Sequence, residues 1–448
     1  MPKHHNKTTI LFGAGAVLSW NAPSTAELTD LVLSSGYYMT DNSTRITKFI
    51  YTTLIEDCNY PKEFVNFETI INVIEELIVY YSYFNSGKKI KSIQQAFFQE
   101  RFLTLLNFGI EGNNITNGFK LEIPKGFKSE YANRANNDVT PGQHFFQNLL
   151  SELLTAIQSR ISNYAYHTKS HSVVLSEQNK EINTLFSKWI AKSIGNDCLR
   201  MYTLNYDRNF KIILENSDTP LEIFEGFDCG REIDYNSYIP ANIPKVLIDT
   251  TSNVHYNLHG SAFWHVEPLD EHQLPNPKFY LTTGIDLAVN NDYPYPTYQS
   301  EIGKTILLSN IVTGYQKTQK SSLTPFKQMQ AAFDRDCCFS DTVVIVGYSF
   351  NDEHINTGIK AAIQYSPHTK FIIVDPGFTS NDFDVRIIMK IFTNAGKMVF
   401  PKTVAKNIHS FYDGRFIVYT MRFNEFMEYK LAQRFSTDYY VNQYNSDY

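Results

Sequence analysis

The sequence lacks the features that would place a chain of 448 residues in a membrane, outside the cell or along nucleic acid. No apolar run approaches the roughly 20 residues that span a bilayer, and residues 1–7 are polar and basic, unlike a leader. The five cysteines include no Cys-x-x-Cys pair, so we expect reduced thiols and no structural zinc. The net charge of -6 gives no overall attraction to nucleic acid. We therefore expect a cytoplasmic protein that binds neither a membrane nor nucleic acid directly.

At its start the sequence does contain a short strand, a glycine turn and a capped helix. The run 8–12 is β-branched and apolar, and Gly13 and Gly15 interrupt it. Ser24 and Glu27 have the spacing of a capping box, after which apolar residues recur at helical intervals. This order is typical of the first half of a nucleotide-binding βαβ unit, in which a glycine turn and a helix N-terminus receive a phosphate. A bare tight turn would give the same short pattern.

Short apolar runs return after residue 196, and each directly precedes a polar residue or a glycine. Together with the first run, the predicted strands are 8–12, 199–204, 254–258, 342–346 and 371–374. The residues that follow them are Gly13, Asn205, His259, Gly347 and Asp375. Ligands of open α/β sheets bind outside the carboxyl ends of the strands, so these five residues together predict a site. Any one of them alone could simply begin a loop.

A long helical segment separates the first strand from the others. Helical spacing of apolar residues is found over 66–78, 92–108, 142–164 and 181–194, and 109–138 is typical of a polar surface loop. We therefore predict an α/β fold with a Rossmann-like, mostly parallel sheet and a large helical insertion. The expected parts are a core at 1–42 and 196–423, the insertion at 43–195, and a C-terminal helix with a polar tail at 424–448.

Two glycine turns and an aspartate are candidates for holding a nucleotide. The turns at 13–15 and 347–349 can present backbone N–H groups to phosphates, and the Ser349 hydroxyl adds a donor. Asp375 follows a predicted strand, where it suits the hydroxyls of a ribose. It could equally cap the turn that leads into Pro376.

An amide, an imidazole and a carboxylate could carry chemistry at the same edge of the sheet. Asn205 offers a fixed amide to a carboxamide, a ribose hydroxyl or a water. His259 is a candidate general base, because the reference pKa of histidine lies near working pH. Asp207 could accept a hydrogen bond from a carboxamide, or it could cap the helix that follows.

Four motifs follow one another in the chain. They are Gly13-Ala14-Gly15 with Pro23 eight residues beyond, Thr203-Leu204-Asn205-Tyr206-Asp207, His259-Gly260 and Gly347-Tyr348-Ser349. This series resembles the NAD-binding core of the sirtuin family, and in particular the sirtuin-like branch found in bacterial phage-defence systems. The resemblance covers 8–36 and 199–376. It implies NAD binding by Gly13, Ala14, Gly15, Pro23, Thr203, Asp207, Gly347, Ser349 and Asp375.

Departures from the family's pattern decide which activity the resemblance implies. Deacylating sirtuins carry a four-cysteine zinc ribbon, which this sequence lacks, and their Gly-Ile-Pro-x-Phe-Arg loop is replaced by residues 21–26. Leu204 stands where they have glutamine. Cleavage of nicotinamide from ribose needs only NAD+, a positioned water or hydroxyl, and a base. The resemblance therefore implies a zinc-free NAD+ glycohydrolase, with Asn205 and His259 catalytic, that empties an infected cell of NAD+ in abortive antiviral defence.

Two other functions and several partners stay open. The chain could be an NAD-dependent protein deacylase, or a non-catalytic sensor of NAD or ADP-ribose. Release of nicotinamide without an acylated peptide would separate the three cases. We expect the insertion to cover the nicotinamide side of the site. A toxic hydrolase needs an off-state, so we expect a homo-oligomer, and the resemblance implies a HerA-type ATPase or a short Argonaute protein as partner.

Overall fold

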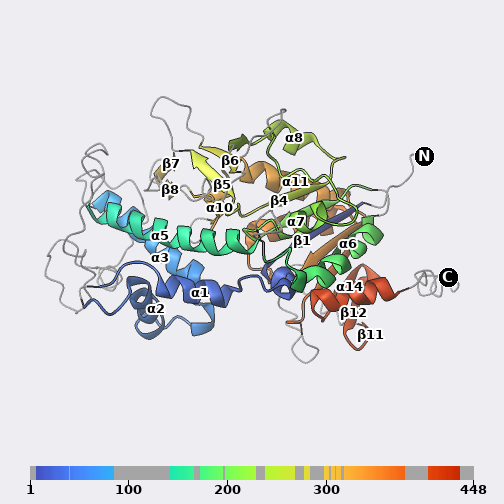
Figure 1. Cartoon of the computed structure of the whole chain (residues 1–448), viewed down its shortest axis with the longest axis horizontal. Helices are drawn as coiled ribbons and strands as arrows, with labels where there is room; N and C mark the ends of the chain where they lie inside the picture. Colours follow the sequence, from blue (N-terminus) through green and yellow to red (C-terminus); the bar gives the residue numbers. More distant parts are fainter. Residues whose placement is uncertain are drawn as a thin grey trace.

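The computed structural model shows a sheet at one end of the protein and a group of long helices at the other (Figure 1). The described residues are 7–39, 41–84, 141–165, 172–194, 197–228, 238–267, 277–282, 297–301, 304–307, 309–313, 317–378 and 402–433. The predicted helix at 92–108, the predicted loop at 109–138 and the polar tail from residue 435 lie outside them.

An eight-stranded sheet organises the protein, in the order β11-β12-β13-β10-β9-β1-β2-β4. The six strands from β13 to β4 are parallel to one another, and β12 and β11 extend this sheet with antiparallel pairs. Counted in chain order, these parallel strands lie in the order 3-2-1-4-5-6, the arrangement of dinucleotide-binding sheets. The predicted Rossmann-like α/β fold is therefore confirmed. The strands are β1 (Thr8–Phe12), β2 (Arg200–Thr203), β4 (Val254–Asn257), β9 (Thr342–Val346), β10 (Lys370–Val374), β11 (Lys402–Ala405), β12 (Ile408–Phe411) and β13 (Phe416–Tyr419).

The first strand can occupy the interior of the sheet because all of its residues are apolar or β-branched, and all are buried. It pairs with β2 on one side and with β9 on the other. Its side chains alternate between the faces, since Leu11 joins the apolar cluster on one side while Ile10 and Phe12 join the cluster on the other.

One face of the sheet is covered by an aromatic cluster. Its helices are η1 (Ala14–Trp20), α6 (Lys180–Ile194), α7 (Asn209–Glu215) and α14 (Phe423–Ala432). Phe12 of β1 stacks on Phe210 with 3.9 Å between ring centroids, and Trp20 meets Phe210 edge-on at 5.5 Å. The far end of the first glycine turn is thus anchored in this cluster by Trp20.

The helical insertion divides between the two faces. Helices α2 (Ile46–Glu56), α3 (Phe67–Phe84) and α5 (Pro141–Tyr164) pack with α1 (Thr25–Ser34) at the left of Figure 1. Helix α6 instead packs on α14, where Phe186 and Trp189 contact the Phe423 ring. Within the predicted insertion at 43–195, the described helices α2, α3 and α5 thus pack in one group and α6 in another. The sequence could not reveal this, because the partner of α6 comes from near the end of the chain.

Capping side chains set the starts of two of these helices. Ser24 and Glu27 form the predicted capping box before α1, and the Asn66 side chain accepts hydrogen bonds from the N–H groups of Glu68 and Thr69 before α3.

The other described elements are η2 (Lys62–Phe64), η4 (Glu177–Asn179), α8 (Ile243–Ile248), α10 (Lys317–Lys320), α11 (Phe326–Phe339), α12 (Glu353–Tyr365), η5 (Tyr412–Gly414), β3 (Tyr238–Pro240), β5 (Trp264–Glu267), β6 (Lys278–Thr282), β7 (Thr297–Glu301) and β8 (Lys304–Leu307). Within the described ranges, no helix is both long and apolar enough to cross a membrane.

Two glycine turns cross where the strand order reverses, between β1 and β9. The Gly13 N–H donates to the Val346 carbonyl and the Gly15 N–H to the Gly347 carbonyl, both at 2.9 Å. A Cβ on Gly15 would lie 2.9 Å from the Gly347 Cα, and a Cβ on Gly347 would overlap the Ala16 nitrogen. Gly347 also has a φ of +60°, in the left-handed region that favours glycine. The glycines are needed because the two backbones touch.

We expect Gly347→Ala to lower the free energy of unfolding by about 3 kcal/mol, because it combines a left-handed backbone with backbone overlap. Gly377→Ala is the matched control, since its Cβ would meet only the Asp375 carboxylate, and it should cost less than about 1 kcal/mol. Urea unfolding measures both. Equal losses in the two variants would show that the crossing is not a constraint.

Candidate active site

A cavity of about 620 Å³ lies at the carboxyl ends of the parallel strands, beside the glycine crossing. It collects the loops that follow β1, β2, β4, β9 and β10, together with side chains from the helical group. The predicted site residues that line it are Gly13, Ala14, Gly15, Pro23, Asn205, Asp207, His259, Gly347, Ser349 and Asp375. Thr203, the remaining predicted site residue, does not line the cavity.

Hydrogen bonds hold Asn205 in place at the cavity wall. Its Nδ2 donates to the Gly13 carbonyl at 3.1 Å, its N–H donates to the Thr203 hydroxyl at 3.0 Å, and its carbonyl accepts from Asn257 Nδ2 at 2.9 Å. Thr203 is fully buried, so it positions Asn205 instead of touching a ligand. Because Gly13 engages the amide nitrogen, the amide oxygen is the group that Asn205 can offer to a water or a hydroxyl.

Asp207 stands one residue before the N-cap of α7, accepts a hydrogen bond from the first residue of that helix, and also lines the cavity. Its Oδ1 accepts the Asn209 N–H at 3.0 Å at the start of α7, and Asn257 Nδ2 donates to its carbonyl at 2.7 Å. Burial raises the pKa of Asp207 to about 6, although the Asn209 N–H favours the charged form. The carboxylate is therefore mostly charged at neutral pH, and its second oxygen can accept a hydrogen bond from a ligand amide.

His259 stands on a bend that requires glycine. Gly260 has a φ of +80°, and a Cβ there would overlap the Asn310 carbonyl. The Val312 N–H donates to the His259 carbonyl at 2.7 Å. These contacts clamp the backbone and leave His259 only 3% exposed. The glycine of the predicted His-Gly pair thus fixes the position of the imidazole.

Two side chains of the segment that follows β9 face the His259 imidazole. His259 Nε2 lies 3.2 Å from Nε2 of His354 and 3.9 Å from Oδ1 of Asp352. Asp352 stands at the N-cap position of α12. Its side chain makes no capping bond, because Lys317 Nζ donates to the carboxylate at 3.2 Å. In the sequence, Asp352 and His354 follow shortly after the glycine turn at 347–349. Nothing in the sequence indicates that their side chains contact His259.

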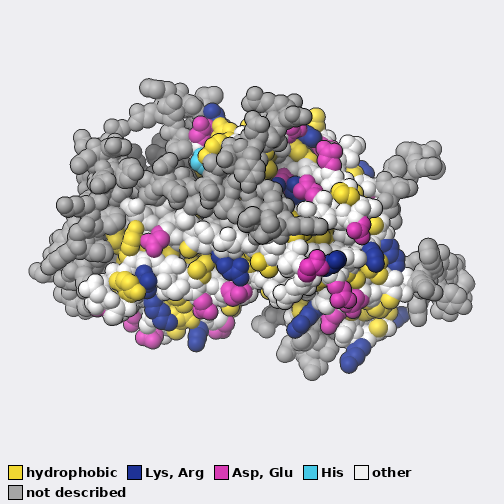
Figure 2. Space-filling model, viewed as in Figure 1, with side chains coloured by type: hydrophobic (Ala, Val, Ile, Leu, Met, Phe, Trp, Pro, Cys, Tyr) yellow, Lys and Arg dark blue, Asp and Glu magenta, His cyan; other side chains and the backbone are white. Residues whose placement is uncertain are grey.

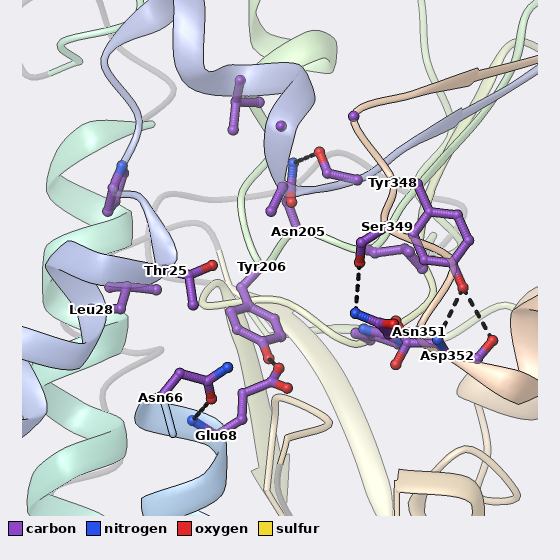
Figure 3. Close-up of a pocket in the computed structure, with 18 of the residues that line it drawn as sticks. Thr25, Leu28, Asn66, Glu68, Asn205, Tyr206, Tyr348, Ser349, Asn351 and Asp352 are labelled. Atoms are coloured by element: carbon purple, nitrogen blue, oxygen red, sulfur yellow. Dashed lines mark hydrogen bonds and ion pairs between the residues drawn. The ribbon is translucent and has the colours of Figure 1, made fainter. Parts of the chain in front are cut away.

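A chain of charges joins the helical group to this histidine pair. Glu68, in the first turn of α3, accepts from Lys317 Nζ at 2.9 Å, and Lys317 in turn bonds Asp352. The Tyr206 hydroxyl donates to Glu68 at 3.3 Å. Figure 3 shows Asn66 and Glu68 on one side of the cavity, facing Asp352 and the Ser349 turn on the other. The residues that α3, its start and α5 contribute to the wall are Asn66, Phe67, Glu68 and Ile161.

Burial lowers the pKa of His259 to about 3. The neighbouring Lys317 and His354 lower it as well, and Asp352 partly opposes them. Burial disfavours the charged form of Asp352, but the ammonium of Lys317, which also donates to the carboxylate, outweighs this effect and the pKa of the carboxyl is lowered. At neutral pH the His259 imidazole is thus neutral and able to accept a proton, while Asp352 is charged.

The structure shows that two of the amides in the first glycine turn already have partners within the protein. The N–H groups of Gly13 and Gly15 are used in the crossing, because the second turn supplies carbonyls at hydrogen-bonding distance. The Ser349 hydroxyl accepts from Asn351 Nδ2 at 3.1 Å and can still donate. Asp375 makes the expected turn cap, accepting the Gly377 N–H at 2.8 Å, and its other oxygen remains for a ribose hydroxyl.

His259, Asp352 and His354 have donor types that bind transition metals, and their ligand atoms lie within 4.8 Å of one another. The ammonium of Lys317 already neutralises the Asp352 carboxylate from 3.2 Å. A dication among these residues would be repelled by that ammonium. The cluster therefore favours a shared proton and an ammonium ion over a metal.

We expect His259 to stay neutral from about pH 8 down to about pH 5, because its pKa is lowered to about 3. Lys317→Met should raise this pKa and Asp352→Asn should lower it, since each removes a charge of known sign. Side-chain ¹⁵N NMR, assigned with His259→Ala, follows the titration. A His259 signal that titrates near the reference value of about 6.5 would contradict the dominance of burial.

The visible face of the described elements shows no concentration of one kind of charge. On the face in Figure 2, basic and acidic side chains are interspersed over the described elements, without a broad basic patch.

Neither a scan against protein-family models nor a search of curated proteins finds a match to this sequence. The geometry of the cavity is therefore the basis on which a function can be argued.

Proposed function

We propose that this protein is an NAD+ glycohydrolase, which cleaves NAD+ to nicotinamide and ADP-ribose. The observation that carries the proposal is the presence of Asn205, a neutral His259 and both glycine turns around one cavity. A volume of about 620 Å³ is in the usual range of small-molecule sites. The cavity lies at the point where the strand order reverses, and sheets with this strand order bind dinucleotides at that point.

In this proposal the ligand extends across the crossing from Asp375 to His259. The free oxygen of Asp375 and the Ser349 hydroxyl receive the adenosine ribose, and the diphosphate lies over the glycine turns. The nicotinamide ribose lies beside Asn205. Asp207, charged at neutral pH, accepts a hydrogen bond from the carboxamide of nicotinamide.

The hydrolysis uses a positioned water and a proton acceptor. The Asn205 amide oxygen holds the water in line with the bond between C1′ and the nicotinamide nitrogen. When this bond breaks, its electron pair leaves with nicotinamide, which becomes neutral, and the water oxygen bonds to C1′. His259 accepts the proton that the added water loses. NAD+ and water thus give nicotinamide, ADP-ribose and one proton.

The lowered pKa of His259 is compatible with this role. A water molecule that adds to a cationic C1′ becomes a strong acid, so even a weakly basic imidazole can accept its proton. The low pKa also keeps the imidazole in its proton-accepting form at every physiological pH. The wall formed by Glu68 and Ile161 limits the entry of other waters on the nicotinamide side.

The biological setting of the proposed hydrolase rests on the sirtuin-like resemblance alone. On that basis the activity would deplete NAD+ in a phage-infected cell. The protein would be a homo-oligomer that is kept inactive by its own assembly, or by a HerA-type ATPase or short Argonaute partner.

A deacylase would need an acylated lysine at C1′ in place of water. A sensor would need no base at all.

We expect His259→Ala and Asn205→Ala to lower kcat for nicotinamide release by about 10²–10⁴, because each removes a group that acts on the chemical step. The Kd for NAD+ should stay within a factor of a few. Chromatographic detection of nicotinamide and calorimetric binding measure the two quantities. His368→Ala, at an exposed position after α12, is the control and should change neither.

Two results would contradict these roles. Turnover by His259→Ala within a factor of a few of the wild type would show that another group is the base. Loss of NAD+ binding and of thermal stability together in both variants would show that Asn205 and His259 are structural residues.

A further inference from the structure

His259 and His354 face each other through the same ring nitrogen and must share one proton. Their Nε2 atoms are 3.2 Å apart, the ring centroids are 5.3 Å apart, and the rings are inclined by 37°. Burial lowers the pKa of both imidazoles, so both are neutral at pH 7. A hydrogen bond between two neutral imidazole nitrogens forms only when one carries a proton and the other does not.

The nearby carboxylate decides which nitrogen carries the proton. Asp352 Oδ1 lies 3.9 Å from His259 Nε2, whereas it makes no such close approach to His354, whose ligand nitrogen is within 4.8 Å. The carboxylate therefore stabilises a proton on His259 Nε2 more than one on His354. The ammonium of Lys317, which would oppose it, is shared between Asp352 and Glu68. His259 is therefore the donor of the pair and His354 is the acceptor.

A neutral imidazole that is protonated at Nε2 has a bare Nδ1. Among the described residues, the Nδ1 of His259 has no hydrogen-bond partner, and the His259 side chain lines the cavity. In this tautomer the nitrogen left for a substrate is one that can accept a proton. The opposite tautomer would leave an N–H there, which cannot.

His354 is itself held firmly at the start of α12. The Asp352 N–H donates to the Tyr348 hydroxyl at 3.1 Å, and this hydroxyl donates to Asn356 at 3.0 Å. Asn356 Nδ2 closes the turn on the Phe350 carbonyl at 2.8 Å. The turn between β9 and α12 therefore fixes the acceptor relative to His259.

We propose that His354 is a positioning residue, which accepts the Nε2–H of His259 and so keeps Nδ1 of His259 bare as the base. The use of that base rests on the proposed hydrolase, but the tautomer does not depend on any substrate. The role is that of the third group of a catalytic triad, which orients a histidine and selects its tautomer. Here a second imidazole takes the place of the usual carboxylate.

Two substitutions at this position separate orientation from packing. His354→Ala removes the acceptor and leaves Asp352, 3.9 Å from Nε2, as the remaining group that favours the Nε2 proton. The share of the Nδ1–H tautomer of His259 should therefore rise without becoming complete, and kcat should fall about 10-fold with an unchanged Kd for NAD+. His354→Glu supplies a group that can only accept, so it should restore the Nε2–H tautomer and most of kcat. His368→Ala is the control for an exposed histidine and should match the wild type.

Side-chain ¹⁵N NMR at neutral pH reads the tautomer without substrate, and nicotinamide release gives kcat. A wild-type His259 protonated at Nδ1 would overturn the proposal. So would a His354→Ala variant with unchanged tautomer and kcat, or a His354→Glu variant as slow as His354→Ala. If the wild type releases no nicotinamide, the proposed hydrolase fails, while the NMR spectra still decide the role of His354.

Discussion

The contact between the turns at Gly15 and Gly347 is the constraint on which the site depends. These turns leave the ends of neighbouring strands, β1 and β9, and meet at backbone distance because neither glycine has a side chain. The meeting fixes the path of the chain after Gly347, which carries Asp352 and His354 to His259. On the other side, the Gly13 carbonyl holds the Asn205 amide. One backbone contact thus sets the relative positions of both proposed catalytic residues.

The second organising feature is the half-buried series of alternating charges from Glu68 through Lys317 to Asp352. Removing charged groups from water costs free energy. In exchange, each charged side chain is held in a fixed position by its neighbour of opposite charge. The carboxylate of Asp352 is consequently fixed near the imidazole pair instead of capping its own helix. The same charges connect the helical group to the site, so a displacement of α3 would leave Lys317 with one carboxylate in place of two.

The sequence predicted the parts of the fold that are encoded locally. The bounds of β1 and β9 were predictable because both are unbroken buried apolar runs, and the start of α1 because Ser24 and Glu27 close a capping box. The strand ends also identified the residues around the cavity. The place of α6 was not predictable, since its aromatic partners come from distant parts of the chain, among them Trp20 and Phe423.

The contacts that set the charges and hydrogen bonds of the site could not be predicted either, because they join residues that are distant in the sequence. Nothing in the sequence near Lys317 indicates that it bridges Glu68 and Asp352, and nothing near His354 indicates an imidazole partner. The glycine amides illustrate the converse. Their pattern suggested phosphate binding, but the second turn, distant in sequence, supplies the carbonyls that use them. Local pattern identified which residues gather, and tertiary contacts decided what each one does.

The most direct test of the central claim is the fate of solvent oxygen during incubation of the purified chain with NAD+ in H₂¹⁸O. We expect equal amounts of nicotinamide and ADP-ribose, with one ¹⁸O at C1′ of the ribose and no need for an acylated peptide. Product that forms only when an acylated peptide is present would contradict it in favour of a deacylase. NAD+ that binds and is recovered intact would contradict it in favour of a sensor.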